Sequence, residues 1–260
     1  MRLCPMELST GQNPIIEKNV MRGERPLKKL GVIAGMGPMA TVTFLKKIIE
    51  LTDAQIDQDH INMVIEHLPS IPDRTAYILD PTKPSPLPMM LAAGRNLVKS
   101  GAEEIAIPCV TAHYFRRELS DALSVPVLDG IEEAGRCLKE LGVKTCGILA
   151  TQGTIHAGLF EKCLKSYHIS WIYPALEDQN RVTEIIYSCV KAGKPVDKAA
   201  FTQVIDCLRR QGAEVIVLGC TELSVMADSW LPDGTFLDVL DCLARCCVRD
   251  FGYEKKQKFA

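Results

Sequence analysis

The sequence has no long apolar run and no excess of one charge. Its apolar stretches are shorter than the roughly 20 residues that a membrane-spanning helix needs, and the opening MRLCPMELSTGQ lacks the continuous apolar segment of a secretory signal. Thirty Lys and Arg residues stand against 32 Asp and Glu residues. A near-neutral balance provides no field for holding nucleic acid or an anionic membrane. We therefore expect a small-molecule ligand, with no nucleic-acid partner and no membrane partner.

The cysteines show neither a disulfide pattern nor a zinc pattern. Eleven in 260 residues is a much lower share than in small disulfide-stapled secreted domains. No CxxC is paired with a distant second pair, which is the strong signal for zinc. One cluster falls in a predicted helix over 237–248, where helix packing explains it: Cys242, Cys246 and Cys247. We expect free thiols in a reducing cytoplasm and no metal site.

Two segments of the chain repeat one pattern around a cysteine. GAEEIAIPCVTAH begins at Gly101 and GAEVIVLGCTELS begins at Gly212, and the cysteine follows the glycine at the same distance in both. Each Gly-Ala-Glu leads into a short apolar run typical of a strand buried on both faces. Ligands of open parallel sheets bind beyond the carboxyl ends of the strands. Cys109 and Cys220 are therefore both predicted at ligand-binding positions.

The predicted position favours reactive thiols. Each cysteine precedes a predicted helix, whose free N–H groups and positive dipole end stabilise a thiolate. Thr111 and Thr221 follow and are candidates for capping those helices. The alternative is that cysteine serves only as a small apolar core residue. Because two cysteines occupy the same position of a repeated segment, we favour a functional role for both.

The whole chain reads as alternating strands and helices in two similar halves. Residues 145–151 repeat the pattern of residues 29–35, at nearly the offset that separates the cysteine motifs. This predicts an α/β fold of two pseudo-symmetric lobes, each a mainly parallel sheet flanked by helices, with the active site in the cleft between them. The predicted units are a loose N-terminal arm (1–27), a first lobe (28–130) joined by a C-terminal helix (228–260), and a second lobe (131–227).

Strands and helices are assigned from hydrophobic periodicity and from Gly and Pro breaks. The predicted strands are 30–34, 62–66, 105–107, 125–128, 145–150, 170–173 and 215–218. The predicted helices are 40–51, 89–100, 112–123, 131–141, 160–166, 177–191 and 237–248. Residues 67–74 and 80–88 are predicted loops at the ligand end, and they place Arg74 in a loop.

Arg74 and the turn after the first strand are further candidates for ligand contact. A guanidinium suits bidentate binding of a carboxylate, although a solvated surface arginine is an equally good interpretation. The turn Gly35-Met36-Gly37 with Ala40 formally matches a dinucleotide motif, but the acidic residue that should end the next strand is missing. A small anion held by backbone N–H groups is the simpler interpretation.

These motifs together resemble the cofactor-independent aspartate/glutamate racemase superfamily, and the aspartate racemases in particular. The resemblance spans roughly residues 30–243 and rests on AGMGPMAT (34–41), DQDHI (57–61), IPDRTAYIL (71–79), PCVTAH (108–113), ATQGT (150–154) and GCTE (219–222). Glutamate racemases are less similar, because they usually carry a histidine at the position of Glu222. The resemblance implies catalysis without pyridoxal phosphate or another cofactor, and a cytoplasmic homodimer that acts on a small acidic amino acid.

The resemblance also implies a role for each site residue. Cys109 and Cys220 would be the two catalytic bases, and Arg74 and Lys191 would hold the carboxylates of the substrate. The remaining predicted substrate contacts are Thr111, Thr221, Val110, Glu222, Gly35, Met36, Gly37, Thr151, Gly153 and Thr154. One departure matters: related sequences carry asparagine at the position of Val110, and valine cannot donate a hydrogen bond. That loss is worth about 1 to 3 kcal/mol.

The sequence therefore predicts an isomerase that racemises aspartate, with glutamate as a second substrate. One alternative keeps the fold and acts on another amino acid or a related carboxylate. Another is a ligand-binding relative that lost turnover through Val110. A dehydrogenase, which rests on the glycine turn alone, is the least favoured.

Overall fold

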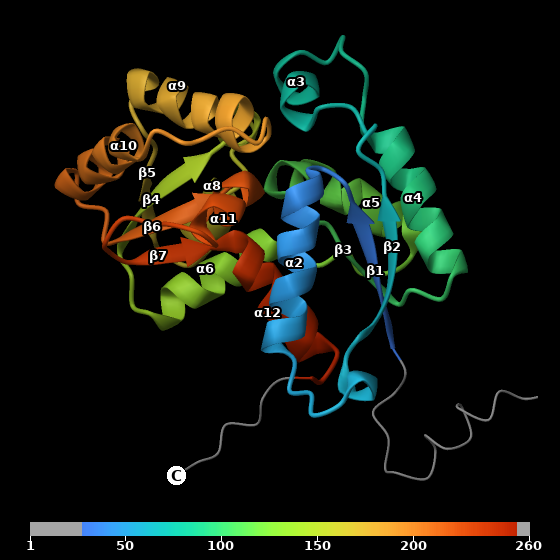
Figure 1. The fold of residues 1–260 in the computed structure, drawn as a ribbon. Helices are drawn as coiled ribbons and strands as arrows, with labels where there is room; N and C mark the ends of the chain where they lie inside the picture. The colour runs from blue at the N-terminus through green and yellow to red at the C-terminus, as the bar shows by residue number, and fades with distance from the viewer. Residues whose placement is uncertain (1–27, 254–260) are drawn as a thin grey trace, which may run out of the picture.

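The computed structural model describes residues 28–253 as two α/β lobes that lie side by side (Figure 1). The predicted N-terminal arm, residues 1–27, lies outside the described residues, as do residues 254–260. Each lobe has its own sheet, and helices α2 (Pro38–Leu51) and α12 (Val239–Asp250) lie between the two sheets. This is the predicted two-lobe α/β fold.

The first lobe is built on a three-stranded parallel sheet in the order β2-β1-β3. Its strands are β1 (Lys29–Ala34), β2 (Asn62–His67) and β3 (Glu104–Ala106). Leu30, Val32 and Ile33 on the central strand have no exposed surface, as expected of a parallel strand covered on both faces. The helices of this lobe are α3 (Arg74–Leu79), α4 (Leu87–Lys99) and α5 (Arg116–Leu123), and a 3-10 turn covers Asp57–Asp59.

The second lobe is built on a four-stranded parallel sheet in the order β5-β4-β6-β7. Its strands are β4 (Thr145–Ala150), β5 (Ser170–Ile172), β6 (Val215–Gly219) and β7 (Phe236–Asp238). Its helices are α6 (Gly130–Glu140), α7 (Gln152–His156), α8 (Glu161–Ser166), α9 (Leu176–Glu184), α10 (Lys198–Arg210) and α11 (Thr221–Ala227).

The two sheets place the cysteine strands at equivalent positions. In the first sheet β1 lies between β2 and β3, and in the second β4 lies between β5 and β6. Cys109 follows β3, and Cys220 follows β6 directly. The internal repeat of the sequence is thus a repeat of strand order, and each cysteine emerges beside the central strand of its own lobe.

Helix α12 packs against both lobes. Leu240, Leu243 and Ala244 belong to the core beneath β1, whereas Val239 and Cys242 belong to the core formed by α6 and β4. The sequence predicted a C-terminal helix over 228–260 that joins the first lobe. This is wrong for β7, which adds to the second sheet, and incomplete for α12, whose apolar residues face both lobes.

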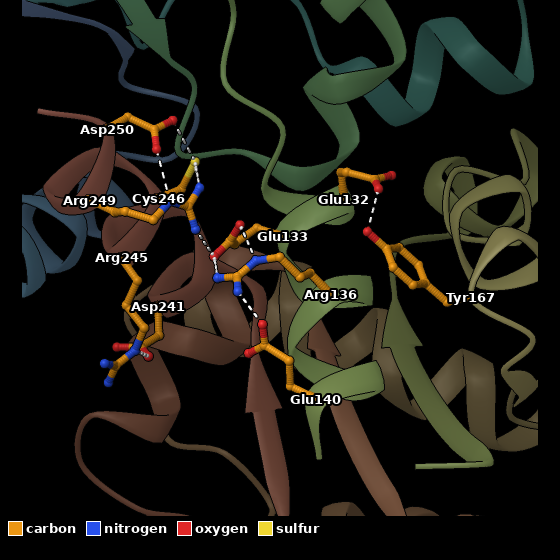
Figure 2. Close-up of polar contacts among 10 residues, drawn as sticks. All are labelled: Glu132, Glu133, Arg136, Glu140, Tyr167, Asp241, Arg245, Cys246, Arg249 and Asp250. Carbon is orange, nitrogen blue, oxygen red and sulfur yellow. Dashed lines mark hydrogen bonds and ion pairs between the residues drawn. The ribbon is translucent and has the colours of Figure 1, made fainter. Parts of the chain in front are cut away.

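A polar network joins α12 to α6 beside this apolar contact (Figure 2). Buried Glu133 on α6 accepts from Arg249 Nη1 of α12 at 2.7 Å and also pairs with Arg136. Burial opposes the charge of Glu133, but the two arginines outweigh burial and hold the pKa of Glu133 below its ordinary value. The same helix pair therefore carries both apolar and ionic contacts between the lobes.

Some predicted elements differ locally from the structure. The predicted strand 125–128 is reduced to a single bridge between Ile105 and Val127, because Pro126 has no N–H to continue a ladder. The predicted helix 112–123 begins as a 3-10 segment, Val110–Phe115, before α5. The predicted helix 177–191 consists of α9 followed by a π-helical turn, Ile185–Val190.

Arg74 does not lie in a loop, contrary to the prediction. It is the first residue of α3, and Asp73 caps that helix by accepting a hydrogen bond from the Ala76 N–H at 2.8 Å. The start of α3 was not predicted because Pro72, next to the N-cap residue, interrupts the helical spacing of apolar residues. Likewise α4 begins at Leu87, inside the predicted loop 80–88, because proline is tolerated in a first helical turn.

Candidate active site

Cys109 and Cys220 line one small cavity at the junction of the lobes. Its volume is about 10 Å³, which is room for about one water molecule. The residues around it come from both lobes: Met36, Asp73, Arg74, Thr75, Cys109, Val110, Thr111, Thr151, Tyr187, Lys191, Cys220, Thr221 and Glu222. We call this space the inner cavity. The two cysteine motifs therefore meet in one site.

A larger pocket of about 410 Å³ adjoins the inner cavity. The two spaces share wall residues: Met36, Asp73, Arg74, Lys191 and Glu222. The outer pocket is also bordered by the glycine turn and by apolar side chains, among them Met39, Ile71, Val190 and Val225. Its volume is in the range of small-molecule sites, whereas the inner cavity is much smaller than an amino acid.

Cys109 is held by the backbone around it. It is the N-cap residue of the 3-10 segment Val110–Phe115. The His113 imidazole lies 3.1 Å from the Cys109 carbonyl through Nδ1, and its Nε2 accepts from the Gly130 N–H at 3.1 Å. Because Nε2 accepts, Nδ1 carries the proton and donates. Burial lowers the pKa of His113, which keeps this neutral tautomer and fixes the turn below the thiol.

Arg74 is a buried cation beside Cys109. Its guanidinium donates to the carbonyls of Pro72 at 3.0 Å and Met36 at 3.4 Å, while Nε donates to no oxygen of the described residues. Burial opposes its charge, but the Cys109 thiol and the nearby carboxylates outweigh burial and raise the pKa of Arg74. The guanidinium is thus a fixed positive charge with a donor left for a ligand.

Cys220 has a carboxylate as its neighbour. Its Sγ donates to Glu222 Oε2 at 3.0 Å, and both side chains are buried. Burial, followed by the charge of Glu222 and this hydrogen bond, raises the pKa of Cys220 well above its ordinary value, and Lys191 opposes the shift. The sequence predicted a thiolate stabilised by the helix N-terminus. In the closed lobes this is wrong for Cys220, because α11 is short and burial dominates.

Three threonine hydroxyls meet across the lobe boundary. Thr111 of the first lobe lies 2.9 Å from Thr151 and 3.0 Å from Thr154 of the second. The predicted capping by Thr111 and Thr221 is wrong, because Cys109 and Cys220 take the N-cap positions and neither helix has a side-chain cap. Thr151 does cap α7, accepting from the Thr154 N–H at 3.2 Å.

Lys191 is paired inside the site. Its Nζ lies 3.7 Å from Asp73 Oδ2 and 4.2 Å from the centre of the Tyr187 ring. It follows the π-helical turn directly. The site therefore contains two cations, Arg74 and Lys191, and two carboxylates, Asp73 and Glu222. The sequence did not predict a site role for Asp73 or Tyr187, because the spacing of the residues around them does not indicate a catalytic or binding motif.

The glycines permit close contacts. Gly35 has φ +94°, and a Cβ there would lie 2.7 Å from the Leu68 backbone. Its N–H donates to Thr41 Oγ1 at 3.0 Å, so this amide is not open to an anion as the sequence suggested. A Cβ on Gly153 would lie 2.8 Å from Thr75 Cα, so glycine lets α7 approach α3 across the lobe boundary.

The structure brings most of the predicted site residues together. The cysteines, the cations, Val110, Glu222, Met36 and the threonines at 111, 151 and 221 line the inner cavity, and Gly35 and Gly37 line the outer pocket. Gly153 and Thr154 stand behind the wall, in contact with Thr75 and Thr111. Over residues 28–253 no group of three or more His, Cys, Asp or Glu side chains could hold a metal ion. No helix in the same range could cross a membrane.

A family profile, a similar sequence and a solved structure all indicate the same class of protein. The profile of the Asp/Glu/hydantoin racemase family matches residues 33–247. The broad specificity amino-acid racemase RacX of Bacillus subtilis (strain 168) is 30% identical over 230 residues, which cover 85% of this chain and 97% of RacX. The solved structure of Picrophilus torridus aspartate racemase superposes with a TM-score of 0.78 at 29% identity, over 89% of this chain and 97% of that one.

A more distant structure has the same fold. Glutamate racemase from Francisella tularensis, in complex with D-glutamate, gives a TM-score of 0.63 at 14% identity and covers 89% of this chain and 84% of its own. The fold is the one found in these racemase structures. The chain belongs to the Asp/Glu/hydantoin racemase family and is an amino-acid racemase, an isomerase. This assignment replaces the dehydrogenase and the non-catalytic alternatives.

Proposed function

We propose that the protein racemises an acidic amino acid, aspartate first and glutamate second, by proton transfer between two cysteines. The observation that carries the proposal is the inner cavity, into which Cys109 and Cys220 enter from opposite lobes. Racemisation removes a proton from one face of the α-carbon and returns one to the other. Two acid–base groups on opposite sides of one carbon are what this reaction needs.

The proposed reaction has two proton transfers. One cysteine, as the thiolate, removes the α-proton, and the other, as the thiol, protonates the opposite face of the carbanion. The charge that develops lies partly on the α-carboxylate, where Arg74 is the nearest fixed cation. A buried guanidinium stabilises such a charge more strongly than the same group in water.

Support for an acidic substrate comes from the cations of the site. Arg74 is buried, is anchored by backbone carbonyls and keeps an N–H donor for a substrate oxygen. Lys191 lines both spaces and would hold a second carboxylate after exchanging its contact with Asp73. The similar structure from Picrophilus torridus is that of an aspartate racemase.

The test is chiral analysis of each amino acid after incubation with the purified protein under reducing conditions. We expect L-aspartate to yield D-aspartate, and D-aspartate to yield L-aspartate, with glutamate converted more slowly. If the correctly folded protein racemises neither aspartate nor glutamate, the choice of substrate is overturned.

A second candidate is racemisation of a larger or less polar amino acid. Val110 gives the inner cavity an apolar wall, and the 410 Å³ outer pocket has several apolar residues in its lining. The Bacillus relative is described as having broad specificity. A panel of L-amino acids, each assayed for its D-form, separates the two candidates: conversion of an apolar or basic amino acid in preference to aspartate would favour the second.

The homodimer stays a prediction that rests on the resemblance, and the cytoplasmic location stays a prediction that rests on the cysteine usage. Sedimentation of the purified protein checks the first, with a mass of twice the chain expected. Fractionation of the source cells checks the second.

A further inference from the structure

Glu222 lines both spaces of the site and also contacts one of the two cysteines. Cys220 lines only the inner cavity, whereas Glu222 lines both the inner cavity and the outer pocket. Its Oε2 accepts from Cys220 Sγ at 3.0 Å and from Thr221 Oγ1 at 3.4 Å. Its Oε1 lies 3.1 Å from the place that a Cβ on Gly37 would occupy, at the edge of the outer pocket.

The two oxygens of Glu222 therefore face different surroundings. One contacts the sulfur, and the other faces the glycine turn that borders the wider space. The carboxylate repels a substrate carboxylate, so its predicted role as a substrate contact can only be toward the ammonium group. It can accept a proton from a thiol on one side and exchange it on the other.

We propose that Glu222 carries protons between Cys220 and the outer pocket, and so restores the protonation state that Cys220 needs in each catalytic cycle. The inference rests on the proposed function. When Cys220 must act as a base, its S–H proton passes to the Glu222 carboxylate, which leaves a thiolate and a carboxylic acid. The thiolate then takes the α-proton and becomes a thiol again. Cys109, as the thiol, protonates the opposite face of the carbanion. The carboxylic acid then releases its proton to water in the outer pocket, and the Cys109 thiolate takes up one proton from water, so that all three groups return to their starting states.

The opposite direction needs the same residue. When Cys220 donates its proton to the carbanion, it is left as a thiolate, and protonated Glu222 restores the thiol. Cys109 is arranged differently, because its charged neighbour is Arg74, a permanent cation that cannot take up a proton. Of the two cysteines, Cys220 is therefore the one whose neighbouring carboxylate can exchange a proton with it.

Other charged and titratable groups also face this pair. Lys191 and Tyr187 approach from the π-helical turn, and Asp73 and Arg74 approach from the start of α3. Lys191 opposes the upward shift in the pKa of Cys220, and Glu222 reinforces it. Removing the Glu222 charge should therefore move the titration of Cys220 toward lower pH, even though activity falls.

The experiment uses Glu222→Gln, which keeps the size of the side chain but cannot take up a proton. We expect kcat to fall about 100-fold, the usual contribution of a proton-transferring group, with KM little changed. Glu222→Asp keeps a carboxylate and should recover part of the lost kcat. Glu118→Gln, on the exposed face of α5, is the matched control and should leave kcat unchanged.

A second measurement does not require activity. In the Cys109→Ser background, the rate of Cys220 alkylation by iodoacetamide is followed by mass spectrometry as a function of pH. Burial slows the reaction at every pH alike, so the midpoint reports the thiol itself. We expect Glu222→Gln to lower that midpoint and Glu118→Gln to leave it in place.

The outcomes separate the possible roles. A raised KM with unchanged kcat in Glu222→Gln would mean that Glu222 only holds the substrate ammonium group, and would overturn the proposal. An unchanged alkylation midpoint would show that the two groups are not coupled, with the same consequence. If the parent protein racemises no amino acid, the proposed function fails, and the alkylation midpoint alone then decides whether Glu222 controls the Cys220 proton.

Discussion

Cys109 and Cys220 occupy equivalent positions in two similar lobes, yet their surroundings carry opposite charges. Each follows a strand that pairs with the central strand of its sheet, and each is the N-cap residue of the next helical segment. Cys109 lies beside the guanidinium of Arg74, and Cys220 donates to the carboxylate of Glu222. The repeat thus supplies two cysteines at equivalent positions, and the residues that break the repeat give them neighbours of opposite charge.

The difference has a chemical purpose in the proposed reaction. Two thiolates could not protonate the carbanion, and two thiols could not remove the α-proton. The proposed reaction therefore needs unlike surroundings for the two sulfurs, and Arg74 beside one and Glu222 beside the other supply them. The predictions below test this asymmetry, from the largest expected effect to the smallest.

Removing either sulfur should have the largest effect. Cys109→Ala and Cys220→Ala should each lower racemisation by about 10³-fold or more, because each removes one of the two groups that exchange protons with the substrate. Chiral chromatography of aspartate measures the rate. Cys207→Ala on α10, away from the site, is the control and should retain full activity. Equal rates in the parent and in either single variant would contradict a two-thiol reaction.

Replacing the cation beside Cys109 should have the next largest effect. Arg74→Lys keeps a positive charge but loses the planar set of donors, and we expect kcat/KM for aspartate to fall about 100-fold. The exposed Arg117→Lys on α5 is the matched control. A rate within twofold of the parent would show that the guanidinium does not bind the reacting carboxylate.

A donor at position 110 should improve the use of aspartate. Val110→Asn adds an amide to the wall of the inner cavity, beside Cys109, and a regained hydrogen bond of about 1 to 3 kcal/mol corresponds to roughly a five- to 150-fold gain in kcat/KM. Val110→Ala adds space without a donor and should show no such gain. Equal gains in both variants would point to size and not to hydrogen bonding.

Removing the lysine near Cys220 should shift the titration of Cys220 upward. Lys191 lowers the pKa of Cys220 by its charge, so Lys191→Met should raise that pKa further and slow iodoacetamide alkylation of Cys220 at any fixed pH below the midpoint. The sign is opposite to that expected for Glu222→Gln. Lys194→Met, a few residues along the chain, is the control. A downward shift in Lys191→Met would refute the charge arrangement around Cys220.

The contact between α6 and α12 should affect stability and not chemistry. Arg249→Met removes one partner of buried Glu133 but leaves Arg136, so we expect a loss of about 1 to 2 kcal/mol in the free energy of unfolding. Arg245→Met breaks an exposed pair with Asp241 on α12 itself and should cost about 0.3 to 0.5 kcal/mol (Figure 2). Urea unfolding compares them, and equal losses would contradict a role for this network in joining the lobes.

The sequence predicted the two lobes and the paired thiols because both depend on local patterns that repeat. Buried strands read as apolar runs, and the cysteines lie in matched frames at their ends. It misplaced Arg74 because Pro72 and Asp73 concealed the start of α3. It missed β7, a three-residue strand that is too short to show a period.

The electrostatics of the site could not be predicted in the same way. The helix N-terminus suggested a stabilised thiolate at both cysteines, but at Cys220 burial and the Glu222 carboxylate outweigh a short helix. Such a balance depends on distances between residues from different elements, for example between Lys191 and Asp73. The sequence shows which charged residues are present, but only the fold determines which of them face each other.

Racemisation in D2O tests the central claim most directly, using L-aspartate and stopping at low conversion. Mass spectrometry after chiral separation gives the deuterium content of each enantiomer. With thiols on opposite faces of the α-carbon, the D-aspartate formed should carry one deuterium at the α-carbon, while the recovered L-aspartate stays largely protonated. Deuterium entering the recovered L-aspartate as fast as the product would mean that one group works on both faces, and would contradict the account.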